Sequence, residues 1–110
     1  MARAVKWAGR AKADLRSAVE YIRKQSPAGA AAFLGQALET ARSLADLSER
    51  GRAVPELDDP DIRELLVGSY RLLYEVHADA VWVLRMVHGN RDLLLAVGRR
   101  TRERAEGSEE

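Results

Sequence analysis

The sequence contains no cysteine, which excludes disulfide bonds and thiolate metal sites. It also contains no apolar run long enough to span a membrane, and its first fifteen residues lack the apolar region of a signal peptide. We therefore expect a cytoplasmic protein that does not bind membranes. A large excess of charge is absent too, because 18 Lys and Arg against 17 Asp and Glu give a formal charge of +1. So small a charge argues against a protein that coats DNA.

Lysine is scarce, and the sequence has fifteen arginines against three lysines. The base composition of the genome explains such a bias as readily as function does. With 46% hydrophobic and 32% charged residues, the 110-residue chain is typical of one soluble globular domain. We expect that domain to occupy residues 1–98. Residues 99–110, which include Arg99, Arg100, Arg102 and Arg104, are expected to form a charged, flexible tail.

The first half of the chain predicts one strand and two helices. Residues 3–8 are expected to form a short strand, and residues 9–24 a helix, because apolar residues recur at i, i+3, i+4 and i+7. Ser26 is expected to cap a second helix that begins at Pro27 and runs to about residue 48. Many apolar positions of the second helix are alanines, so the two helices can approach closely as an antiparallel hairpin.

The second half predicts a loop and three antiparallel strands. Residues 50–61 contain one glycine and two prolines and should form a loop. Gly68-Ser69 predicts a tight hairpin that pairs Val67 with Tyr70 and Leu65 with Leu72. A turn at residues 77–80 should pair Tyr74 with Val83, Leu72 with Arg85 and Tyr70 with Val87. Residues 93–97 fit either a strand or a helical turn. The predicted fold is a two-layer α+β domain of order β-αα-βββ, with the helical hairpin packed on a mainly antiparallel sheet.

Arginines interrupt these strands, and their faces separate them into two groups. Because successive side chains alternate, Arg63 and Arg85 fall on the apolar face, where we interpret them as structural residues that reach the sheet edge or pair with Glu56 or another loop acid. The other face is mixed, apolar enough to bind a partner and too charged to be fully buried. It is predicted to carry Glu64, Leu66, Arg71, Trp82, Met86 and His88.

Several segments together resemble the RelE/ParE family of bacterial type II toxins, from Lys6-Trp7 to about Leu93. They are W-x4-K-A-D-L-x5-Y-I at residues 7–22, the Ser26-Pro27 start of the second helix, G-R-x-V-P-E-L at 51–57, R-E-L-x-V-G-x-Y-R-x-x-Y at 63–74 and V-H-G-x-R-D at 87–92. Each segment alone is weak, but their order and spacing make the resemblance fairly specific.

The resemblance implies one fold with two possible activities. RelE-like members are ribosome-dependent ribonucleases that cut mRNA, whereas ParE-like members inhibit DNA gyrase and block replication. Both kinds are neutralised by a cognate antitoxin, ParD-like or RelB-like, which typically lays a helix over the helical hairpin. No cofactor or metal is implied. The antitoxin contacts expected on this hairpin are Leu15, Val19, Ile22, Leu34 and Leu38.

The ribonuclease alternative requires a general acid/base and cations around the phosphate. By resemblance the cations would be Arg71, Arg91 and Arg52. Arginine is a poor proton shuttle because its pKa lies far above neutrality, so His88 is the only candidate for the proton-transfer group on this surface. A Tyr or His close to the carboxy terminus would complete the set, yet no Tyr, His or Phe follows His88. His88 could instead bond a backbone carbonyl, and Arg71 with Glu64 could be only a cross-strand ion pair.

The sequence favours the ParE-like activity, because the 51–57 segment and the missing terminal Tyr depart from the RelE-like pattern. In this interpretation the mixed sheet face binds the target protein. Arg71 and Arg91 are expected to act as anchors for carboxylates or phosphates, and Trp82 and Met86 as apolar contacts.

Overall fold

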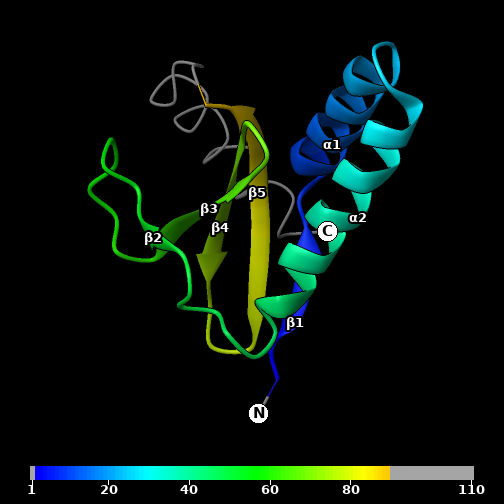
Figure 1. The fold of residues 1–110 in the computed structure, drawn as a ribbon. Coiled ribbons are helices and arrows are strands. Elements are labelled where there is room, and N and C mark those ends of the chain that lie inside the picture. Colours follow the sequence, from blue (N-terminus) through cyan, green and yellow to red (C-terminus); the bar gives the residue numbers. More distant parts are fainter. Residues whose placement is uncertain (1, 90–110) are drawn as a thin grey trace.

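The fold is two helices packed on one face of a five-stranded mixed sheet, seen in a computed structural model that describes residues 2–89 (Figure 1). The sheet order is β1-β5-β4-β3-β2, with β1 parallel to β5 and the other neighbours antiparallel. This confirms the predicted α+β fold. The predictions for Arg91, residues 93–97 and the tail from Arg99 lie outside the described residues. The elements are β1 (Ala4–Trp7), α1 (Gly9–Arg23), α2 (Pro27–Ser43), β2 (Arg52–Ala53), β3 (Ile62–Val67), β4 (Tyr70–Val76) and β5 (Ala80–His88).

Helix α2 begins as predicted and ends earlier than predicted. The Ser26 hydroxyl accepts a hydrogen bond from the Gly29 N–H at 2.9 Å, with Pro27 in the first turn. The helix ends at Ser43 rather than near residue 48, because the N–H groups of Leu44 and Ala45 bond carbonyls three residues back. Leu44 follows the helix and is fully buried, so this apolar residue packs in the core without belonging to the helix.

The hairpin between β3 and β4 has the predicted register. Val67 lies opposite Tyr70, Leu65 opposite Leu72 and Arg63 opposite Tyr74. Gly68 has φ +59°, the left-handed conformation that this two-residue turn requires and that glycine adopts without strain.

The register between β4 and β5 shifts by one residue. Val76 pairs with Val81 and Tyr74 with Val83, as predicted, but Leu73 then pairs with Arg85, which leaves Leu84 as an extra residue. The predicted pairs of Leu72 with Arg85 and Tyr70 with Val87 are therefore wrong. Leu72 instead lies opposite Met86, and Tyr70 opposite His88. A bulge of this kind reverses the faces of every later side chain in the strand.

Asp14 of α1 contacts β5 at this bulge. Its carboxylate accepts hydrogen bonds from Arg85 Nε at 2.7 Å and from the Met86 N–H at 3.0 Å. Arg85, predicted to reach the sheet edge or pair with a loop acid, is only 2% exposed and is paired with the helix residue Asp14 instead. The contact joins the helical layer to the sheet at the irregular position.

Two clusters of buried residues lie on the two faces of the sheet. The main core, between helices and sheet, contains Ala11, Ala18, Phe33, Ala37, Ala41, Leu44, Val67, Leu72, Tyr74, Val81, Val83 and Met86. The second core, on the opposite face, contains Val54, Ile62, Leu73, Leu84 and Val87. The segment after β2 extends on that opposite side in Figure 1 and supplies Val54. No helix within residues 2–89 has the length and hydropathy needed to cross a membrane.

Candidate functional site

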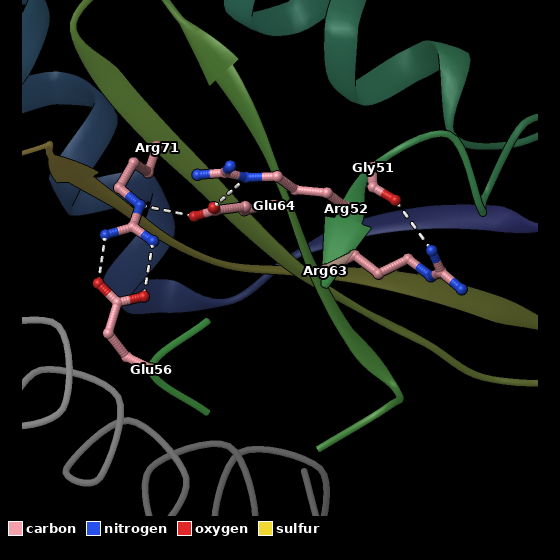
Figure 2. A network of polar contacts seen from close by, with 6 residues as sticks. All are labelled: Gly51, Arg52, Glu56, Arg63, Glu64 and Arg71. Atoms are coloured by element: carbon pink, nitrogen blue, oxygen red, sulfur yellow. Dashed lines mark hydrogen bonds and ion pairs between the residues drawn. The ribbon is translucent and has the colours of Figure 1, made fainter. Parts of the chain in front are cut away.

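Arg71 lies at the centre of a charged network on the face opposite the helices (Figure 2). Its Nε donates to Glu64 at 2.5 Å, and its two terminal nitrogens donate to the two carboxylate oxygens of Glu56 at 2.9 Å each. Strand β2 adds a second cation, because Arg52 is paired with Glu64 in the ladder and its Nε donates to the other Glu64 oxygen at 2.7 Å. The carboxylates of Glu56 and Glu64 thus accept hydrogen bonds from all three side-chain nitrogens of Arg71.

Two members of this network are buried, so removing one of its partners should cost more than breaking a surface ion pair. The Glu64 side chain is 1% exposed and that of Arg71 10%, whereas those of Glu56 and Arg52 are 38% and 67% exposed. Hydrogen bonds to Glu56 and then to Glu64 raise the pKa of Arg71 above its usual range. The hydrogen bond from Arg71 lowers the pKa of Glu56. The guanidinium remains charged, and the nearby carboxylates neutralise it.

Glu56 connects the segment after β2 to the sheet in a pH-dependent way. Because its pKa is lowered in the folded state, its stabilisation is present above the ordinary Glu value of about 4.3 and is lost as the pH falls through the lowered value. We expect Glu56→Gln to lower the free energy of unfolding by about 1 kcal/mol or less at about pH 6, since Glu56 is partly exposed. The difference from wild type, measured by urea unfolding, should shrink as the pH falls below about 4. Asp58→Asn, an exposed neighbour, is the control; a difference that persists at low pH would contradict the contact.

Gly51 and Arg63 hold the beginning of this segment. The Gly51 N–H donates to the buried Tyr74 hydroxyl at 2.9 Å, and a Cβ at Gly51 would lie 2.5 Å from that oxygen. Burial raises the pKa of Tyr74, so the hydroxyl stays neutral. Arg63 donates to the Gly51 carbonyl at 2.9 Å, so of its two predicted alternatives the pairing with Glu56 or another loop acid is not observed. Arg63 thus has the structural role expected of it, with backbone carbonyls as its hydrogen-bond acceptors.

His88 lies on the helix side of the sheet, away from the Arg71 network. It is opposite Tyr70 in the ladder, and the two ring centroids are 5.4 Å apart in an edge-on arrangement. The prediction that His88 shares a face with Arg71 is wrong, because the bulge at Leu84 reverses the end of β5. Of the four residues in the ribonuclease alternative, Arg52 and Arg71 are close together, His88 is on the other face, and Arg91 lies outside the described residues.

The predicted apolar target contacts are also separated. Trp82 is half-buried beside the second core, and the Lys6 ammonium lies 5.6 Å from its ring centroid. Met86 is 3% exposed in the main core, so its predicted place on the mixed face is wrong. The same bulge turns Met86 towards the helices, so its side chain is not available as a surface contact.

The five expected antitoxin contacts divide between the two helices. Leu15, Val19 and Ile22 of α1 are partly buried and pack against the main core, so only part of each side chain is accessible. The apolar residues whose spacing predicts helix α1 are the same residues that pack towards the sheet. Leu34 and Leu38 of α2 are 36% and 38% exposed, and they remain candidates.

Sequence reasoning missed the central role of Glu56 and Asp14. Glu64 is two positions from the direct partner of Arg71 along β3, and only long side chains close that gap. The only sequence feature that could have indicated a role for Glu56 is its place in the G-R-x-V-P-E-L segment at residues 51–57. Within residues 2–89, no group of three or more His, Asp or Glu side chains could hold a metal ion.

Comparisons with known proteins identify the family through one family model and show a similar fold in two solved structures. A family model described as ParE toxin of type II toxin-antitoxin system, parDE, matches residues 5–93. Among solved structures, a chain of the chromosomal ParDE TA system from P. aeruginosa is 20% identical, with a TM-score of 0.66 over 78% of this chain and 95% of that one. A chain of the RelBE2 toxin-antitoxin complex from Mycobacterium tuberculosis is 25% identical, with a TM-score of 0.56 over 80% and 99%. No curated protein matched the sequence.

Proposed function

The chain belongs to the ParE toxin family, within the ParE/RelE superfamily of type II toxins, and we propose that it inhibits DNA gyrase and is neutralised by a cognate antitoxin. In this proposal it acts in the cytoplasm, blocks replication and needs no cofactor. The antitoxin is the product of an adjacent gene. A ParD-like antitoxin is the expected kind, given the family.

The state of Arg71 is the observation that carries the choice of target. In the ribonuclease alternative this arginine must face a phosphate, but here Glu56 and Glu64 occupy its donor nitrogens. A phosphate could reach it only by displacing Glu56. His88, the one candidate for proton transfer, lies on the other sheet face beside Tyr70. These positions disfavour RNA cleavage and so favour a protein target. Because Glu56 and Glu64 occupy its nitrogens, Arg71 is not available as the anchor expected for that target, and its role is structural.

A brief pulse of toxin expression tests the proposal in cells. DNA synthesis and protein synthesis are followed separately by labelled precursors, with co-expression of the adjacent antitoxin gene as the control. We expect DNA synthesis to stop first, and the antitoxin to prevent the arrest. Early arrest of protein synthesis, with mRNA cut on translating ribosomes, would contradict gyrase as the target.

A further inference from the structure

The outer face of helix α1, defined by Lys12, Arg16 and Lys24, carries cations that lie outside the Arg71 network. All three side chains are exposed, and within residues 2–89 none of them makes a hydrogen bond or ion pair. Glu20, the acid on the same side of the helix, is already paired with Arg23. The outer face of α1 therefore has three positive charges that are available to a ligand.

The three cations form a row that a straight polyanion can follow. An α-helix turns by about 100° and rises by about 1.5 Å per residue, so the row covers about 120° of the helix circumference and about 18 Å of its length. Double-stranded DNA carries one phosphate charge per about 1.7 Å of its axis, so a duplex beside α1 presents about ten phosphates to the row. Ser17 and Tyr21, exposed next to the row, have hydroxyl groups that can donate to phosphate oxygens.

The distribution of charge over the fold favours an anionic ligand on the helical side. Residues 2–43, which form β1 and both helices, carry eight Lys and Arg against three Asp and Glu, a formal charge of +5. Residues 44–89, which form the other strands, carry five against nine, a formal charge of −4. The small net charge of the chain thus conceals a positive helical side, which attracts polyanions at long range.

The lack of exposed aliphatic side chains on α1 favours a nucleic acid over a protein. Protein–protein interfaces centre on buried apolar anchors, whereas protein–DNA interfaces are more polar and more positive. Within residues 2–89 the exposed large aliphatic side chains are Leu34, Leu38, Leu47 and Leu66, and none of them belongs to α1. An apolar contact surface is therefore available on α2, and a cationic one on α1.

We propose that the outer face of α1 binds the phosphate backbone of double-stranded DNA, with Lys12, Arg16 and Lys24 each contacting one phosphate. This inference rests on the proposed gyrase target, because gyrase acts on double-stranded DNA, and it gives the toxin a second contact in that complex. Another surface of the toxin contacts the enzyme, and α1 contacts the DNA that the enzyme holds. Phosphate contacts carry no sequence information, so this binding is independent of base sequence.

Fluorescence anisotropy with a labelled duplex of about 30 base pairs tests the phosphate contacts. For the purified full-length toxin, three such contacts predict a slope of about −2.7 in a plot of log binding constant against log salt concentration, or about fortyfold weaker binding at 200 mM than at 50 mM salt. Lys12→Gln/Arg16→Gln should weaken binding at least about tenfold at low salt and change the slope to about −0.9. Lys24→Gln alone should change the slope by about 1.

Lys6→Gln/Arg50→Gln is the matched control, because it also removes one lysine and one arginine, at exposed positions outside α1. It should change the binding constant less than about threefold, since it leaves the phosphate contacts in place. Equal effects of the two double variants, or no binding of the duplex by wild-type toxin, would overturn the inference.

Competition distinguishes DNA from other polyanions. Unlabelled duplex should displace the labelled duplex at a lower concentration than single-stranded RNA of the same length or polyglutamate of the same charge, because the duplex has the higher charge density. Tighter binding of the RNA or of polyglutamate would overturn double-stranded DNA as the ligand.

A supercoiling assay with the same variants separates this inference from the proposed target. Lys12→Gln/Arg16→Gln should require at least about tenfold more toxin than wild type for equal inhibition of gyrase, and the matched control should not. Equal inhibition by wild type and Lys12→Gln/Arg16→Gln would overturn the DNA contact and leave gyrase as the target. If wild-type toxin binds the duplex through α1 and supercoiling is unchanged, the DNA surface is supported and gyrase fails as the target.

Discussion

Replacement of Asp14 by alanine is expected to lower the free energy of unfolding by about 3 kcal/mol. The substitution removes the carboxylate that faces Arg85, a side chain only 2% exposed, and the acceptor of the Met86 N–H at the bulge. Loss of one partner of a buried ion pair is costly because the other charge remains away from water. Urea unfolding of the purified domain measures the effect.

Two further variants separate charge from geometry at this position. Asp14→Asn retains an acceptor for the Met86 N–H, so its loss should be smaller than that of Asp14→Ala. The double variant Asp14→Ala/Arg85→Met should be more stable than Asp14→Ala alone, because no charge is left buried. Asp46→Ala, at an exposed position, is the control and should stay within about 0.5 kcal/mol of wild type. A change that small for Asp14→Ala would contradict the role of the contact.

Replacement of Arg71 by methionine should have a comparable effect, a loss of about 3 kcal/mol. The buried Glu64 would keep only Arg52 of its two guanidinium partners, and Glu56 would lose both of its bonds to Arg71. Arg71→Lys should be nearly as destabilising as Arg71→Met, because one ammonium cannot reproduce the three directed contacts of the guanidinium. Arg16→Met, at an exposed position on α1, is the control.

The result for Arg71 also distinguishes a structural from a catalytic residue. A structural Arg71 predicts that toxicity falls in proportion to the folded fraction, and that it returns when an unrelated stabilising change restores folding. A catalytic arginine predicts a fully folded, equally stable and inactive variant. Stability of Arg71→Met within about 0.5 kcal/mol of wild type would contradict the structural interpretation.

The parts of the fold that local sequence determines were predictable. Ser26-Pro27 marks the start of α2, and Gly68 marks a turn that only a residue tolerant of positive φ can make. From Gly68 the whole β3–β4 register follows. The helical stripe of α1 correctly indicated an amphipathic helix. It could not reveal that its apolar side was already occupied by the sheet.

The parts that depend on distant residues were not predictable. No glycine or proline marks the bulge at Leu84, and Asp14, which stabilises it, is about seventy residues away in the sequence. The bulge reverses the faces of the later side chains, so Met86 and His88 lie on the helix side of the sheet and are separated from Arg71. Strand β2 has two residues and lies in a segment whose glycine and prolines indicate a loop. Arg71 was recognised from its motif, but its bond to Glu56 required the path of that loop.

A supercoiling assay with purified gyrase tests the choice of target most directly. Relaxed plasmid, gyrase and ATP are incubated with increasing amounts of folded toxin, and the antitoxin is added in a parallel series. We predict that the toxin blocks supercoiling or traps gyrase on cut DNA, and that the antitoxin reverses the effect. Supercoiling that proceeds unchanged with excess folded toxin would contradict gyrase as the target.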